Sequence, residues 1–241
     1  MRLFGIQASA ERRAAEALSN QLDPLEFLRL VLEDELLARR ERAGKMLVTR
    51  AKFRSTADLE DWDHSYDRGV TKAKIRDVGL LTFYHNKENL IVLGGTGVGK
   101  THFAIAVGRR ACADGVAVAF IPMNFLFEEA NAERAAGRYV SHVRRLSKTG
   151  VLILDDFGLR NYTHDEASVL VDILEDRYQK GAVVVTSQVN PDGWLKLFED
   201  PVIGEAIVDR LRSPSQQLVL KGSSYRERLN GTRTGQPTKS N

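Results

Sequence analysis

The sequence predicts a three-layer α/β domain built on a parallel sheet and preceded by a small helical N-terminal domain. Four short apolar runs alternate with segments long enough for helices, a pattern typical of strands buried on both faces of a parallel sheet. Residues 1–55 lack such runs and carry leucines at helical spacing instead. The chain has 241 residues, 43% of them hydrophobic and 28% charged, which suits one core of ordinary size with a small appendage.

Residues 1–55 are the predicted helical domain. Ser9 is a candidate cap for an Ala- and Glu-rich helix that ends near residue 19. A stronger start signal is Asp23-Pro24-Leu25-Glu26, which places a capping Asp before a proline and a glutamate three residues after the cap. Leucines at 25, 28, 32 and 36 then recur at helical spacing, and Gly44 is expected to end this helix.

The predicted second domain spans residues 56–230, after a stretch rich in Asp and Ser. Its strand-like runs are residues 90–93, 116–123, 151–154 and 182–186. A capping box at Thr163-His164-Asp165-Glu166 begins one of the helices between them. Residues 231–241 have the composition of a disordered tail.

Positive charge is concentrated in two places, although the net charge of the whole chain is only +3. Residues 38–54 contain seven basic residues and a single acid, Glu41. Residues 221–241 contain five basic residues and one acid. Such clusters make nucleic acid a candidate partner, and a solvated helix face is the alternative. The candidate DNA contacts are Arg39, Arg40, Arg42, Lys45, Arg50, Lys52 and Arg54.

The cysteine content and the lengths of the apolar runs indicate the expected cellular location. The lone Cys112 excludes an internal disulfide and a cysteine-cluster zinc site, and it favours a reducing, cytoplasmic location. No apolar run approaches the roughly 20 residues that cross a bilayer, so no membrane is expected among the partners.

A phosphate-binding loop follows the first predicted strand. Its glycines let successive backbone N–H groups point at phosphate oxygens, and the helix that follows favours an anion at its start. Lys100 would place its charge on the β- and γ-phosphates of ATP, and the Thr101 hydroxyl would ligate Mg²⁺. A glycine-rich turn with a chance lysine is the alternative. The loop consists of Gly94, Gly95, Thr96, Gly97, Val98, Gly99, Lys100 and Thr101.

Two acids, Asp155 and Asp156, follow four consecutive apolar residues. A buried parallel strand would deliver them to the sheet edge beside the phosphate loop. Asp155 would hold Mg²⁺, and Asp156 would orient the water that attacks the γ-phosphate or, alternatively, support the other ligands. A pair of ordinary surface turn acids is the remaining interpretation.

Two further polar positions are candidates for catalysis. Gln188 follows Thr186 and Ser187 at the end of a predicted strand. In NTPases with an extra strand between the nucleotide motifs, a polar residue at this position senses the γ-phosphate. A simple turn at the end of the strand explains these three polar residues equally well. Arg210 could reach the ATP of a neighbouring subunit as an arginine finger. A salt bridge to Asp209 or Glu205 is its alternative.

Together these motifs resemble the IstB family, the helper ATPases of bacterial insertion sequences and relatives of the helicase loader DnaC. The resemblance rests on Lys100-Thr101-His102, on residues 152–158, on Asp209-Arg210-Leu211 and on the helix that begins near Leu25. It covers roughly residues 22–228. The chain departs from the family pattern at Gln188, where asparagine is usual.

The resemblance implies an AAA+ core of the P-loop NTPase class that forms a homo-oligomer on duplex DNA with ATP at the subunit interfaces. It further implies Mg-dependent ATP hydrolysis and regulation of a partner transposase. Lys100, Thr101 and Asp155 keep the ATP and Mg²⁺ roles, and Asp156 occupies the position of the catalytic acid. A helicase loader that docks its partner through residues 25–37 is the alternative function.

Overall fold

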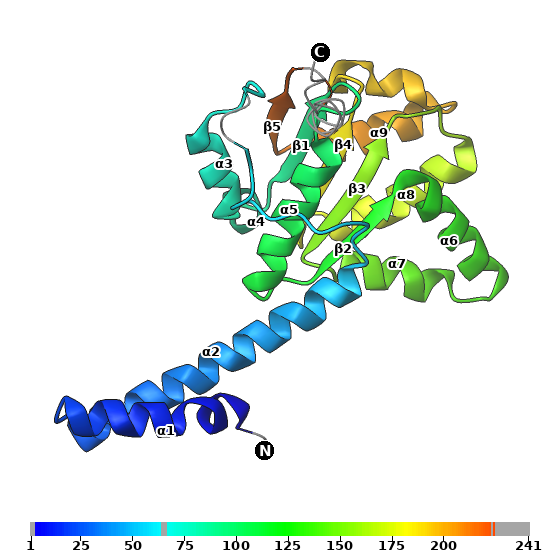
Figure 1. The fold of residues 1–241 in the computed structure, drawn as a ribbon. Helices are drawn as coiled ribbons and strands as arrows, with labels where there is room; N and C mark the ends of the chain where they lie inside the picture. Colours follow the sequence, from blue (N-terminus) through cyan, green and yellow to red (C-terminus); the bar gives the residue numbers. More distant parts are fainter. Residues whose placement is uncertain (1–2, 64–66, 223, 225–241) are drawn as a thin grey trace, which may run out of the picture.

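The computed structural model describes residues 3–63, 67–222 and 224 (Figure 1). It begins with a helical hairpin made of α1 (Phe4–Ser19) and α2 (Pro24–Ala51). The Asp23 carboxylate accepts a hydrogen bond from the Leu25 N–H, and Pro24 occupies the first turn, so α2 starts where the sequence predicts. The predicted start of α1 at Ser9 is wrong, because the helix begins at Phe4 and buries Ser9 within it.

The prediction that Gly44 ends the long helix is also wrong, since α2 continues to Ala51. Gly44 instead lies against the following domain. A Cβ atom at this position would stand 3.2 Å from the backbone oxygen of Cys112 in α5 (Lys100–Ala113). The missing side chain therefore serves the close approach of two helices, a role that the sequence pattern does not distinguish from a helix stop.

All strand pairs of the five-stranded sheet are parallel, in the order β2-β3-β4-β1-β5. The strands are β1 (Asn89–Gly94), β2 (Val118–Pro122), β3 (Val151–Phe157), β4 (Ala182–Ser187) and β5 (Ser215–Leu220). The first four correspond to the predicted apolar runs. β5 was not predicted, because it is an edge strand with half-exposed glutamines at its start.

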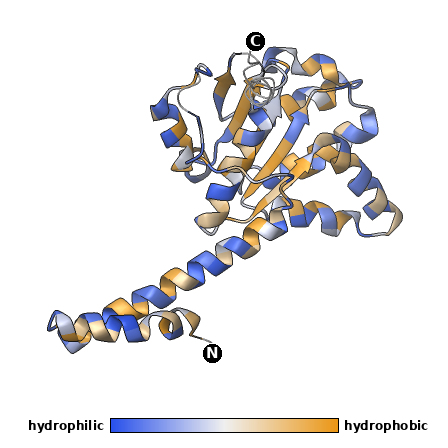
Figure 2. Cartoon of the chain, in the orientation of Figure 1, coloured by the Kyte–Doolittle hydropathy of each residue, from blue (hydrophilic) through white to orange (hydrophobic). Residues whose placement is uncertain are grey.

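Helices cover both faces of the sheet, which confirms the predicted three-layer α/β architecture. Alternate residues of each strand enter one of two cores: Leu90 and Val92 of β1 join the core under α5, whereas Ile91 and Leu93 join the opposite one. Figure 2 shows the apolar strands between these layers. The remaining helical segments are α3 (Lys72–Gly79), α4 (Thr82–His85), α6 (Met123–Ala135), α7 (Tyr139–Ser147), α8 (His164–Arg177), the 3₁₀ segment η1 (Pro191–Leu197) and α9 (Pro201–Arg212).

Two predictions concern the ends of the chain and the membrane. The predicted tail at residues 231–241 lies outside the described residues, and the domain limits 1–55 and 56–230 stay predictions. Within residues 3–63 and 67–222, no helix combines the length and the apolar character needed to span a bilayer.

Candidate nucleotide-binding site

The phosphate-binding loop connects β1 to α5, as the sequence predicts. Gly94, Gly97 and Gly99 have φ angles of 151°, 80° and 103°, which side chains other than glycine rarely adopt. A Cβ atom at Gly97 would lie 2.4 Å from the Ser224 hydroxyl, whereas one at Gly95 would meet nothing within 4 Å. The loop is therefore held in a conformation that depends on glycine at three of its four glycine positions.

Lys100 and Thr101 begin α5 directly after this loop. The Lys100 ammonium is buried and donates to the Gly95 carbonyl at 2.8 Å, so its charge lies over the loop. The Thr101 hydroxyl donates to Asp155 Oδ1 at 2.9 Å. The two nucleotide motifs, 54 residues apart in sequence, thus meet through a direct hydrogen bond.

Asp155 is fully buried at the end of β3. Burial raises the pKa of its carboxyl group and the charge of Asp156 adds to this, whereas hydrogen bonds from Thr186 and Thr101 act in the opposite direction. Its second oxygen, Oδ2, is buried and has no hydrogen-bond partner among the described residues. A buried carboxylate oxygen next to a threonine hydroxyl is a donor set that fits Mg²⁺.

Thr186 of β4 joins the two acids, a role that the sequence analysis missed. Its hydroxyl donates to Asp155 Oδ1 at 2.6 Å and accepts the backbone N–H of Asp156 at 2.9 Å. The sequence signal is a single threonine that ends an otherwise apolar strand, and the structure buries it completely. β4 lies between β1 and β3, so its end stands between the phosphate loop and the acids.

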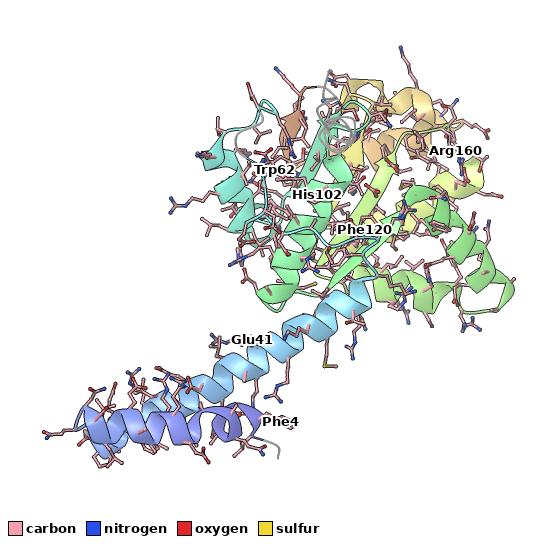
Figure 3. The ribbon with its side chains drawn as sticks, viewed as in Figure 1. Phe4, Glu41, Trp62, His102, Phe120 and Arg160 are labelled. Atoms are coloured by element: carbon pink, nitrogen blue, oxygen red, sulfur yellow. The ribbon has the colours of Figure 1, made fainter. Side chains whose placement is uncertain are left out.

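Asp156 has a left-handed backbone, with φ of 63°, at a register shift between β3 and β4. Residues three apart in a regular strand point to opposite faces, whereas Leu154 and Phe157 join the same core, so the alternation changes across this irregularity. Asp156 lines a cavity of about 500 Å³ with Arg54, Asn124 and Arg160 among its walls. Figure 3 marks Arg160 on this side of the sheet domain.

The two remaining catalytic candidates lie in different places. Gln188 accepts a hydrogen bond from Thr96 of the phosphate loop at 2.8 Å, so it lies at the nucleotide site. The Arg210 backbone oxygen accepts from Asn89 at the start of β1, the edge of the sheet opposite the loop. Within one chain, therefore, Arg210 is remote from the phosphate loop.

The Arg210 side chain forms the ion pair with Asp209 that the sequence offered as an alternative, at 2.9 Å. Its second ionic partner is Glu175, at 3.1 Å, and not Glu205. The guanidinium also lies over the Tyr178 ring, 4.7 Å from the centroid. These contacts hold Arg210 near the molecular surface at the end of α9.

Arg68 is a cationic residue near the loop that the sequence analysis did not single out. A Cβ atom at Gly99 would lie 3.3 Å from its Nη1 atom, and its guanidinium covers the Trp62 ring at 3.9 Å. Burial and the positive charge of Arg68 lower the pKa of His102. Figure 3 shows Trp62 and His102 at this corner of the domain. Trp62 itself packs edge-on against Phe103 and belongs to the core.

The predicted DNA contacts lie along the second half of α2 and just beyond it. Arg39 is paired with Glu35 at 2.7 Å, and the Arg42 guanidinium lies over the Phe4 ring, so these two are partly used within the hairpin. Arg40, Lys45, Arg50 and Lys52 are exposed, as is Arg54. Four of these lie on α2 or at its C-cap, whereas Arg54 lies at the cavity that Asp156 lines.

Comparison with known proteins finds relatives described as ATP-binding proteins. The family model of IstB-like ATP binding proteins matches residues 1–232. A protein of Mycobacterium tuberculosis, described as ATP-binding and located in an insertion sequence, is 33% identical over 97% of this chain and 94% of its own length. The ATP-binding protein of insertion sequence IS21 from Pseudomonas aeruginosa is 34% identical over 88% of this chain and 80% of its own length.

Solved structures give the fold. DnaI matches with a TM-score of 0.57 and 19% identity, covering 77% of this chain and 98% of its own. AMPPCP-bound DnaA from Aquifex aeolicus matches with a TM-score of 0.59 and 16% identity, covering 78% of this chain and 58% of its own. These neighbours share the AAA+ P-loop fold. With the family model matched over nearly its whole length and relatives above 30% identity, the chain belongs to the IstB-like ATP binding protein family.

Proposed function

We propose that this protein is a Mg-dependent ATPase that assembles on duplex DNA and regulates a partner transposase. The observation that carries the proposal is the contact of Thr101, Asp155 and Thr186 beside the phosphate loop. The insertion-sequence origin of its relatives favours transposition over helicase loading. A cytoplasmic location fits a protein that works on the host chromosome.

Each side chain has a role that follows from its position. Thr101 and Asp155 would hold Mg²⁺, which supplies positive charge to the phosphate oxygens. Lys100 neutralises charge on the β- and γ-phosphates from the start of α5. Asp156 accepts the proton of the attacking water, and Gln188 donates its amide N–H to the γ-phosphate side of the loop.

Oligomerisation completes the site in this proposal. Arg210 is distant from the phosphate loop of its own chain, yet it lies near the end of a helix at the surface. In a ring or helix of subunits it would reach the ATP of a neighbour and stabilise charge in the transition state. Nucleotide binding would then favour assembly, and hydrolysis would release it.

The proposal is tested by comparing Asp156→Asn with the unmodified protein. Asparagine tolerates the left-handed backbone, so only the carboxylate charge is lost. We expect ATP affinity within about threefold of the original and turnover reduced by at least 100-fold, in line with the loss of a general base. Undiminished phosphate release by the variant would reassign the catalytic acid.

DNA binding is tested by its dependence on salt. If the exposed basic residues of α2 contact phosphates, the logarithm of the affinity should fall linearly with the logarithm of salt concentration. A variant with Arg40, Lys45 and Arg50 changed to glutamine should show a shallower slope by about two to three. An unchanged slope would place the duplex on another surface.

A further inference from the structure

A basic side chain from outside the phosphate loop lies directly against it. Arg68 is only 4% exposed, a degree of burial that is rare for a charged residue. A Cβ atom at Gly99, the last glycine of the loop, would lie 3.3 Å from the Arg68 Nη1 atom. The guanidinium therefore packs on the turn at which α5 begins.

The backbone of Arg68 is fixed at the end of β5. Its carbonyl oxygen accepts the Lys221 N–H at 2.7 Å, and a Cβ atom at Gly69 would lie 3.0 Å from the Lys221 side chain. Leu220, the residue before Lys221, is paired in the sheet with Gly94, the first glycine of the loop. The segment that carries Arg68 is thus joined to the strand beside the loop.

Trp62 holds the guanidinium from the other side. The guanidinium carbon lies 3.9 Å from the centre of the Trp62 ring, and this ring packs edge-on against Phe103 of α5 at 5.1 Å (Figure 3). Stacking on an aromatic ring suits the planar guanidinium and restricts its motion. The positive charge is therefore held in place against the helix that begins with Lys100 and Thr101.

This position gives the charge an effect on an anionic ligand of the loop. The first backbone N–H groups of α5 already favour an anion through the helix dipole. A charge that is removed from water interacts more strongly with other charges than one at the surface does. Arg68 adds such a charge on the side of Gly99, whereas Lys100 donates to the carbonyl of Gly95.

We propose that Arg68 is a positioning residue of the nucleotide site, whose buried charge strengthens the binding of the ATP phosphates at the start of α5. The inference rests on the ATP binding proposed above and adds a residue from outside the phosphate loop. Arg68 acts within its own subunit, unlike Arg210, so its effect requires no assembly.

The location of Arg68 predicts how it affects turnover. It packs on Gly99 and is absent from the walls of the cavity that Asp156 lines. Its charge therefore acts on the phosphates in the ground state and in the transition state alike. Loss of such uniform binding raises KM and leaves kcat unchanged.

The charge is tested by comparing Arg68→Gln with Arg68→Lys. Both variants lose the planar contact with Trp62, and only the lysine retains the charge. In titration calorimetry with ATP and Mg²⁺, we expect affinity at least about tenfold weaker for the Gln variant and within about threefold of the original for the Lys variant. Equal affinities of the two variants, whether strong or weak, would overturn the proposal.

Two more variants serve as controls. Arg68→Met keeps an apolar side chain over Trp62 and should bind ATP as weakly as Arg68→Gln, which separates the loss of charge from any instability of the Gln variant. Arg110→Gln removes a charge from the last turn of α5, where Arg110 pairs with Asp114 at 3.1 Å. Its ATP affinity should stay within about twofold of the original, because exposed pairs contribute little. A loss equal to that of Arg68→Gln would reduce the effect to net charge and refute a local role.

Kinetics separate this inference from the proposed ATPase activity. In Arg68→Gln the KM for ATP should rise at least about tenfold with kcat within about threefold of the original, the reverse of the expectation for Asp156→Asn. A drop in kcat at unchanged KM would refute the positioning role. Arg68-dependent binding of ATP without any hydrolysis would refute the ATPase proposal and leave this inference intact.

Tryptophan fluorescence gives a readout that does not depend on turnover. The chain has two tryptophans, and Trp194 is fully buried in the opposite core. Because Trp62 contacts the guanidinium, ATP binding should change its emission in the original protein. Trp62→Phe, which retains Trp194, should bind ATP with no such change. A change that persists in Trp62→Phe, or an original protein whose emission does not respond to bound ATP, would contradict the coupling of Arg68 to the phosphates.

Discussion

Thr186 offers the most direct test of how the candidate site is held together. Its hydroxyl donates to the buried carboxylate of Asp155 and accepts the backbone N–H of Asp156. Thr186→Val keeps the size and the branching of the side chain, so the strand should still form and pack. It removes both hydrogen bonds at once and leaves two polar groups without this partner.

The magnitude follows from those two groups. An unsatisfied buried polar group costs about 1–3 kcal/mol. Asp155 retains its bond from Thr101 and the Asp156 N–H is only partly buried, so the lower half of the range applies to both groups. We therefore expect the free energy of unfolding to fall by about 2–4 kcal/mol, which corresponds to a decrease of roughly 4–16 °C in Tm for a chain of this size.

The assay combines urea unfolding with phosphate release. Turnover should fall more than ATP affinity, because the loop that binds the phosphates is intact while the position of Asp156 is not. Thr186→Ser is the matched control: it keeps the hydroxyl and should lose only about 0.5–1.5 kcal/mol for the missing methyl group. A Val variant as stable and as active as the Ser variant would show that Thr186 does not hold the acids.

Three further predictions concern the loop, the subunit interface and the thiol. Gly97→Ala should abolish measurable ATP binding, because its Cβ would lie 2.4 Å from the Ser224 hydroxyl on a backbone with φ of 80°. Gly95→Ala is the control and should bind ATP within a few-fold of the original affinity. Equal affinities of the two variants in a nucleotide titration would contradict the loop geometry. Arg210→Ala should be inactive alone and regain ATPase activity when mixed with Lys100→Ala, since some interfaces then contain both an intact phosphate loop and an arginine. No recovery in the mixture would indicate that Arg210 serves only in its ion pairs. Burial raises the pKa of Cys112 from 9.0 to about 11. The protonated thiol therefore stabilises the folded state below pH 9, and this contribution of roughly 2–3 kcal/mol is lost as the pH rises from 9 to 11. In chemical denaturation across this pH range, the free energy of unfolding of Cys112→Ala should decline less than that of the original protein.

The sequence predicted those parts of the structure that depend on local patterns. Four of the strands were marked by apolar runs, and α2 was marked by its Asp-Pro start. The phosphate loop was recognisable because its glycines and its lysine are required by the backbone geometry and by charge. Asp155 was placed correctly next to Thr101 because parallel strands end at one edge of the sheet.

What escaped prediction depends on contacts between distant segments. Gly44 has the same appearance in a sequence whether it ends a helix or lets a neighbouring helix approach. Arg68 lies close to the phosphate loop in a segment whose backbone is joined to β5's far end, since its backbone oxygen accepts the Lys221 N–H across 153 residues. β5 is half polar because only one of its faces is fully covered, so its pattern resembles that of a loop.

The backbone at Asp156 links the local and the distant parts of the site. A left-handed conformation costs a residue with a side chain roughly 1–2 kcal/mol, less for aspartate, so something must hold it. The hydrogen bond from its N–H to Thr186 does so, and the same hydroxyl holds Asp155. One buried hydroxyl on the neighbouring strand therefore fixes both acids at the point where the register of β3 shifts, with Asp155 hydrogen-bonded to Thr101 and Asp156 at the cavity beside Arg54.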